Sequence, residues 1–159
     1  MTATAQPYDP LRAAMATTEA GPRYHRRPHA VITRAIADTS IFIAGETDRP
    51  VDVTALPDEI AVTAITIGEL RAGVLAAADV ATRDRRLRTL TAALQLDPVS
   101  IDATVAEHWA KLRVLLRDNR LTMGVNDSWI AATAMALDVP VLTQDDGFPV
   151  IDGLEVIRA

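Results

Sequence analysis

Four carboxylate side chains are the residues of this sequence best suited to chemistry: Asp38, Glu69, Asp127 and Asp145. Asp38 and Asp145 each follow an apolar segment, and the other two lie near the starts of apolar helical segments. Carboxylates held a few ångströms apart raise one another's pKa and resist joint ionisation. Because a hard divalent cation removes that cost, four acids that converge predict a metal site.

The available ligand types favour magnesium at such a site. The chain has no cysteine, and its three histidines do not pair at metal-ligand spacing, which disfavours zinc. Mg²⁺ prefers oxygen ligands and keeps several waters, and Mn²⁺ can substitute for it. Bound magnesium can acidify and orient an attacking water and stabilise charge that develops on phosphate oxygens.

Each acid also has a purely structural interpretation. Asp38 and Asp127 are suitable helix N-caps, and Glu69 alone is an ordinary solvated helix residue. Asp145 and the adjacent Asp146 are frequent residue types in turns. The metal-site hypothesis therefore depends on the joint placement of the acids.

The elements expected to position these acids alternate between strand and helix. Strands are predicted at residues 32–38, 59–63, 99–101, 139–142 and 154–157. Helices are predicted directly after Asp38, from Thr66, over 79–95, from a cap at Asp102, and from Asn126 or Asp127. This order indicates an α/β fold with a mainly parallel central sheet and helices on both faces, and such sheets place ligand sites beyond the carboxyl ends of their strands.

Helical spacing predicts which side chains of these helices face the core. The predicted core residues are Ile67, Leu70, Val74 and Leu75, then Leu87, Leu90 and Leu94, then Val105, Trp109, Leu112 and Leu116. Trp129 is interpreted, like Trp109, as a core anchor rather than a base-stacking platform.

Length and charge indicate one domain in the cytoplasm. The 159 residues suit one core, with residues 1–31 read as a flexible leader and 32–159 as the domain. The formal net charge is −5, with about +3 over the first 34 residues and about −8 over the rest, which argues against unspecific nucleic-acid binding. No apolar stretch reaches the length of a signal peptide or membrane span, so no membrane association is expected.

Four short motifs, in order along the chain, resemble those of PIN-domain toxins of the VapC type. They are residues 37–43 (ADTSIFI), 68–73 (GELRAG), 126–134 (NDSWIAATA) and 143–148 (TQDDGF). The resemblance covers about residue 32 to the C-terminus and is specific as a set. It implies a PIN-like three-layer fold in which Asp38, Glu69, Asp127 and Asp145 hold magnesium, with hydroxyls from Ser40 and Thr143 supporting them.

The same resemblance implies an activity and partners. The reaction would be endonucleolytic RNA cleavage by metal-activated water, leaving a 5′-phosphate and a 3′-hydroxyl. An antitoxin of the VapB type would dock on the apolar helix surface around Leu70 and Val74, and homodimers are expected. Four arginines are the candidates for contact with the RNA backbone, with a solvated helix face as the alternative: Arg83, Arg85, Arg86 and Arg88.

One departure from the family pattern concerns the fourth motif. Many relatives carry an acid immediately before its phenylalanine, whereas this chain has Gly147 before Phe148. Asp145 and Asp146 therefore both remain candidates for the fourth acid.

Other functions remain open on the sequence alone. A phosphatase of the haloacid dehalogenase type also uses an aspartate after the first strand, but it needs a second aspartate two residues later, where this chain has Ser40. A PIN nuclease that processes RNA without a toxin role fits the same motifs. A catalytically silent PIN binding module would predict a broken carboxylate set, and all four positions are filled here.

Overall fold

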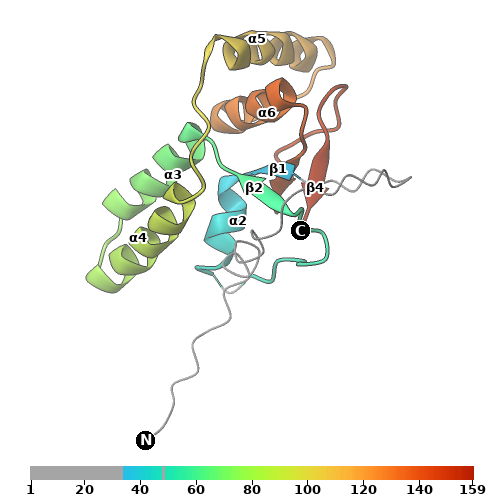
Figure 1. The fold of residues 1–159 in the computed structure, drawn as a ribbon. Helices are drawn as coiled ribbons and strands as arrows, with labels where there is room; N and C mark the ends of the chain where they lie inside the picture. Colours follow the sequence, from blue (N-terminus) through green and yellow to red (C-terminus); the bar gives the residue numbers. More distant parts are fainter. Residues whose placement is uncertain (1–33, 48) are drawn as a thin grey trace, which may run out of the picture.

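A parallel four-stranded sheet forms the centre of the computed structural model, which describes residues 34–47 and 49–159. The strands are β1 (Arg34–Ala37), β2 (Glu59–Ala61), β3 (Val141–Thr143) and β4 (Val156–Arg158). Their order in the sheet is β2-β1-β3-β4, and every pairing is parallel (Figure 1). The predicted parallel α/β sheet is confirmed, whereas the expected leader lies outside the described residues.

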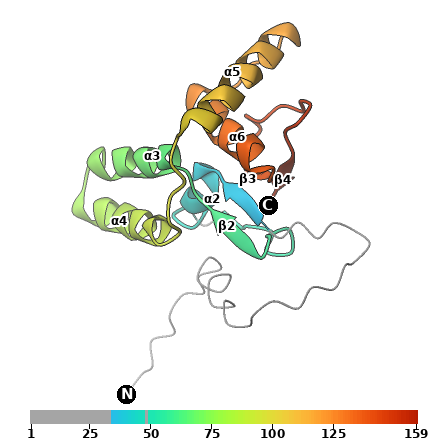
Figure 2. The same cartoon turned by 45° about the horizontal axis from the view of Figure 1, so that its top comes forward.

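Helices cover both faces of this sheet. They are α2 (Thr39–Ala44), α3 (Ala64–Leu75), α4 (Val80–Leu94), α5 (Ala103–Asp118) and α6 (Val125–Leu137). Figures 1 and 2 show α3 and α4 side by side on one flank of the sheet and α5 and α6 together on the other. Successive strand residues point to opposite faces, so Ala35 and Ala37 join the core under α2, α3 and α4, while Ile36 joins the core under α5 and α6.

Side-chain caps set the starts of most helices. Asp38, Asp79 and Asp102 are N-caps, as the sequence indicates for Asp38 and Asp102. Helix α3 begins two residues before the expected Thr66, because the Thr63 hydroxyl accepts a hydrogen bond from the Thr66 backbone N–H at 3.1 Å. The strand predicted at residues 99–101 is reduced to a single bridge between Val99 and Thr63.

Three leucines predicted to face the core are exposed instead. Leu75, Leu87 and Leu94 are 70%, 43% and 45% exposed. Helix α4 contributes Leu90 and Ala93 to the core, whereas Leu87 and Leu94 of its predicted apolar face lie outside the buried contact with the neighbouring elements. Periodicity predicted the stripe, but the width of the buried contact depends on the neighbouring helices.

The carboxyl ends of β1 and β3 meet at one edge of the sheet. Ala37 is in register with Leu142, and the backbone N–H of Asp38 donates to the carbonyl of Leu142 at 2.8 Å. The segments that follow both strands therefore start next to each other. No helix in the described part of the chain is long and apolar enough to cross a bilayer.

We predict that Leu112→Ala destabilises the fold by about 2–5 kcal/mol, because Leu112 is a fully buried side chain of α5 and its removal leaves a cavity. The matched change Leu87→Ala, on a half-exposed side chain of α4, should cost less than about 1 kcal/mol. Urea unfolding of both variants measures the difference. Equal losses would show that the core under α5 is not the stabilising layer described.

Candidate active site

Asp38 lies at the sheet edge where the first and fourth motifs meet. It is 3% exposed and caps α2. Its Oδ2 accepts hydrogen bonds from the backbone N–H of Ser40 at 3.3 Å and from the hydroxyl of Thr143 at 3.0 Å. Asp38 therefore serves as an N-cap, but this role uses only Oδ2. Its Oδ1 accepts no hydrogen bond from the described residues.

Two hydroxyl groups connect the first motif to the fourth. Thr143 Oγ1 lies 3.2 Å from Ser40 Oγ and accepts from the backbone N–H of Asp145 at 2.9 Å, while Ser40 Oγ accepts from the backbone N–H of Gln144 at 2.9 Å. A hydroxyl has one proton to donate, so Thr143 donates to Asp38 and Ser40 donates to Thr143. The structure thus places Ser40 and Thr143 beside the Asp38 carboxylate, where the resemblance expects them.

Glu69, on α3, is held by two residues from other elements. The Thr39 hydroxyl donates to its Oε2, and the Asn126 amide donates to its Oε1 at 2.8 Å. Sequence reasoning assigned no role to Thr39 or Asn126, although each stands beside an acid of the first or third motif. Their positions next to Asp38 and Asp127 are the signal by which they could have been found.

Asp127 lies in the first turn of α6, within the electrostatic reach of the other three acids. Partial burial raises the pKa of its carboxyl group, and the neighbouring carboxylates of Asp38, Glu69 and Asp145 raise it further. The four acids predicted from the sequence are therefore brought together. In the arrangement shown, no three acid or histidine side chains of the described residues are close enough to ligate one metal ion.

Two glycines make room for the Asp127 carboxylate. A Cβ at Gly124 would lie 2.6 Å from Asp127 Oδ2, and a Cβ at Gly147 would lie 3.2 Å from the same atom. Gly124 is also the N-cap of α6, and this cap has no side-chain hydrogen bond. The helix begins at Val125, one or two residues before the start at Asn126 or Asp127 that the sequence predicted. The absence of an acid at Gly147 leaves this close approach to Asp127 open.

The structure separates the roles of Asp145 and Asp146. The Asp145 carboxylate contributes to the raised pKa of Asp127, whereas the Asp146 side chain is fully exposed and lies 3.3 Å from Arg158. Arg158, on β4, also donates to the backbone carbonyls of Asp145 and, at 3.5 Å, of Phe148. The Arg158 guanidinium thus ties β4 to this loop, in which both acids are exposed and Asp145 is the one that raises the pKa of Asp127.

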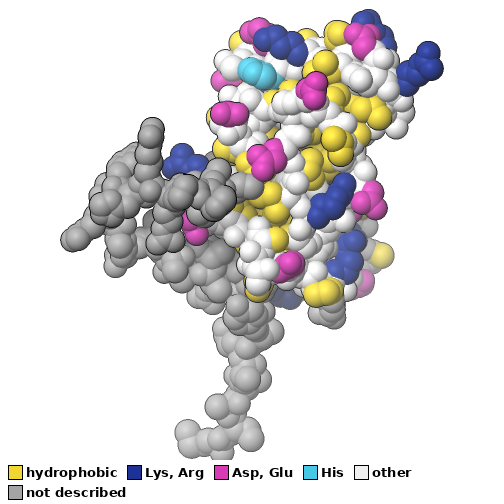
Figure 3. Space-filling model, turned by 90° about the vertical axis from the view of Figure 1, so that its right-hand side faces the viewer, with side chains coloured by type: hydrophobic (Ala, Val, Ile, Leu, Met, Phe, Trp, Pro, Cys, Tyr) yellow, Lys and Arg dark blue, Asp and Glu magenta, His cyan; other side chains and the backbone are white. Residues whose placement is uncertain are grey.

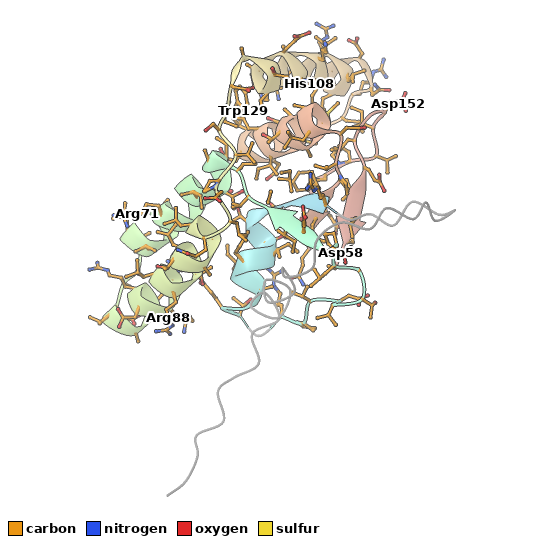
Figure 4. The ribbon with its side chains drawn as sticks, viewed as in Figure 1. Asp58, Arg71, Arg88, His108, Trp129 and Asp152 are labelled. Atoms are coloured by element: carbon orange, nitrogen blue, oxygen red, sulfur yellow. The ribbon has the colours of Figure 1, made fainter. Side chains whose placement is uncertain are left out.

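The arginines of α4 fall into two groups. Arg85 and Arg86 line a cavity of about 210 Å³ that also includes Glu69. Arg83 and Arg88 are exposed and do not line it, and Figure 4 shows Arg88 extending from the outer side of α4. Only the first pair is therefore close to an acid of the site.

The two tryptophans stack on each other at the contact between α5 and α6. The rings of Trp109 and Trp129 are 4.5 Å apart and nearly parallel, and both side chains are half-buried. The indole N–H of Trp109 donates to the buried Ser128 hydroxyl at 2.9 Å, which in turn donates to the carbonyl of Val125 at 2.6 Å. They are not the core anchors expected, because their polar and stacking contacts lie outside both cores.

The model of the PIN domain matches residues 35–154. Ribonuclease VapC5 of Mycobacterium tuberculosis is 43% identical over 126 residues, covering 77% of this chain and 93% of the relative. Ribonuclease VapC4 of the same organism is also 43% identical, covering 79% and 97%. The chain belongs to the VapC family of PIN-domain proteins.

Solved structures agree with this family assignment. The VapC-family chain superimposes with a TM-score of 0.74 on a crystal structure of VapBC-5, a toxin–antitoxin system of Mycobacterium tuberculosis, at 39% identity and over 80% of this chain and 99% of that one. VapBC2 of Rickettsia felis, bound to a promoter DNA fragment, gives a TM-score of 0.67 at 22% identity, which shows the shared fold. The predicted PIN-like fold is confirmed.

We predict that Asp127→Asn stabilises the protein at pH 7 in the presence of a chelator. The pKa of Asp127 is higher in the folded than in the unfolded chain, so the unfolding free energy falls as pH rises between the two values. The amide removes this penalty, and its benefit should shrink toward about pH 4, where the folded carboxyl group becomes protonated.

Thermal unfolding of wild type and variant at both pH values measures this effect. The matched control is Asp146→Asn, because Asp146 is fully exposed and pairs with a cation. A stability gain in the control, or none in Asp127→Asn at pH 7, would contradict the described crowding of carboxylates.

Proposed function

We propose that this VapC-family protein is a magnesium-dependent endoribonuclease that acts as the toxin of a toxin–antitoxin pair. The observation that carries the proposal is the gathering of four carboxylates at the carboxyl edge of a parallel sheet, where three of them raise the pKa of the fourth. Relatives at 43% identity that bear the name ribonuclease support the activity.

The donor set fits a hard divalent cation. Asp38, Glu69, Asp127 and Asp145 supply only carboxylate oxygens, which suit Mg²⁺, with Mn²⁺ as a substitute. Partial burial raises the pKa of Asp127, and the carboxylates of Asp38, Glu69 and Asp145 raise it further, which a bound cation would offset. The bound ion would acidify a water and stabilise charge on the phosphate.

The residues around the acids would keep them in place during the reaction. Thr143 donates to Asp38, and Thr39 and Asn126 donate to Glu69, so two of the four carboxylates are oriented by neutral donors. The guanidinium of Arg158 holds the Asp145 loop through backbone carbonyls. Orientation of this kind supports catalysis because the acids need not reorganise when charge develops.

The partners are proposed on the same basis. The solved VapBC-5 structure bears the name of a toxin–antitoxin system, which supports a VapB-type antitoxin for this chain. Its action on RNA would take place in the cytoplasm. Homodimer formation is supported by the face in Figure 3, where hydrophobic side chains form a band flanked by charged ones, and by the exposure of Val114, Leu137 and Val150.

A silent binding module is the second candidate among PIN proteins. It does not explain why all four acid positions are filled, or why Asp38 and Glu69 are buried or half-buried and oriented by specific donors. An RNA-processing nuclease without a toxin role shares the chemistry and differs only in its partner. Growth arrest on expression, relieved by the antitoxin, separates these two nucleases.

We predict that Asp38→Asn reduces cleavage of RNA in Mg²⁺ by at least about a hundredfold while the fold persists, because the amide cannot serve as an anionic metal ligand. Cleaved products with a 5′-phosphate are measured by end-specific ligation, and Mn²⁺ binding is measured by isothermal titration. Asp146→Asn is the matched control and should remain active, since Asp146 faces solvent. Undiminished cleavage by Asp38→Asn, or cleavage that persists in excess chelator, would contradict the mechanism.

A further inference from the structure

A cavity of about 210 Å³ lies between the end of α2 and the helices α3 and α4. Its walls include apolar side chains and charged groups of both signs: Ile43, Leu70, Glu46, Glu69, Arg85 and Arg86. Because Glu69 is also one of the four acids, the cavity adjoins the candidate active site. Neither the chemistry of cleavage nor the metal site accounts for its other charged groups.

Glu46 is the most informative of these groups. Its side chain is nine-tenths buried, and its closest described cation is Arg86, whose Nε lies 3.9 Å from Glu46 Oε2. That distance is too long for a hydrogen bond, and no described residue donates one to this carboxylate. The Glu46 carboxylate therefore has a cation at ion-pair distance but no hydrogen bond from a described residue, so its oxygens remain acceptors for donors from a ligand.

Arg86 cannot close this gap by turning toward Glu46. Its Nη1 donates to the carbonyl of Gly73 at 2.6 Å, which ties the guanidinium to α3. The guanidinium has five N–H donors, so others remain for a ligand. The two carboxylate oxygens of Glu46 and the N–H donors of Arg86 thus line the same cavity.

The balance of charge excludes simple ions as occupants. A lone cation would meet two arginines, and a lone phosphate would meet two carboxylates. A flat neutral group with both donors and acceptors on its edge satisfies the walls better, and Ile43 and Leu70 provide apolar surface for its ring.

We propose that this cavity binds a guanine base of the RNA substrate, an inference that rests on the proposed ribonuclease function. Guanine presents two adjacent donors, N1–H and the N2 amino group, which match the two oxygens of Glu46. Its O6 acceptor matches Arg86, in the manner of arginine contacts to guanine elsewhere. The other three bases lack two adjacent donors on this edge, and RNA bases splayed from single strands are read in this way.

The first test compares cleavage sites in an RNA pool of randomised sequence. Wild type should show guanine at one fixed position relative to the cleaved bond, and Glu46→Gln should lose about tenfold of that preference, because an amide has one acceptor oxygen in place of two. Glu107→Gln is the matched control, since Glu107 is exposed on α5. Inosine, which lacks the N2 amino group, should lower cleavage by wild type and leave Glu46→Gln unaffected.

The second test measures binding without cleavage, so that its failure differs from failure of the proposed function. Isothermal titration should show that wild type binds guanosine monophosphate at least about tenfold more tightly than adenosine monophosphate, and that Glu46→Gln does not. Equal binding of both nucleotides, or an unchanged guanine preference in folded Glu46→Gln, would overturn the inference. Loss of antitoxin binding by Glu46→Gln with no change in guanine preference would assign the cavity to a protein partner and overturn it too.

Discussion

Repulsion between carboxylates is the constraint on which the arrangement of this protein depends. Four acids from separate segments lie near one edge of the sheet, and the pKa of Asp127 is raised by its burial and by the other three carboxylates. The hydrogen bonds given to Asp38 and Glu69 come from neutral hydroxyl, amide and backbone donors. Within the described residues, no lysine or arginine side chain forms an ion pair with any of the four. The acids are therefore held in position without being neutralised, which preserves their charge for a cation.

The parallel sheet separates this strained edge from the layers that stabilise the fold. Residues of β1 alternate between two apolar cores, so each core is complete without any of the four acids. Asp38 and Asp145 lie on the segments that follow strands, and Asp127 lies in the first turn of α6, where the helix dipole favours negative charge. Glu69 lies further along α3, in its second turn. Gly124 adds room for Asp127 at the expense of a side-chain cap. Stability and chemistry thus draw on different parts of the same elements.

The order of elements was predictable because it depends on local patterns, and the four acids remain a prediction that the motifs supply. Apolar runs predicted the sheet, and Asp38 and Asp102 marked helix starts through their cap chemistry. The partners in contacts between distant segments were not predictable: the place of Thr39 beside Asp38 marks it as a candidate, but nothing local joins it to Glu69, or Arg158 to the Asp145 loop. The exposure of Leu87 and Leu94 on α4 was not predicted for the same reason, since their burial depends on how much of α4 the neighbouring elements cover. The distinction between Asp145 and Asp146 likewise required knowledge of where β4 lies.

Helix α2 links recognition to chemistry through its length. Asp38 precedes this helix, and Glu46 follows it, so the two carboxylates are separated by eight residues. At 1.5 Å per residue, that segment spans about 12 Å, which is roughly the length of three to four stacked nucleotides in a nucleic-acid strand. A guanine held by Glu46 would then lie a few nucleotides from the cleaved bond rather than next to it. Glu46 and Arg86 line the cavity together with Glu69, but they contact none of the other three acids. Substitutions in the cavity can therefore alter which RNA sequence is selected while Asp38, Asp127 and Asp145 keep their arrangement.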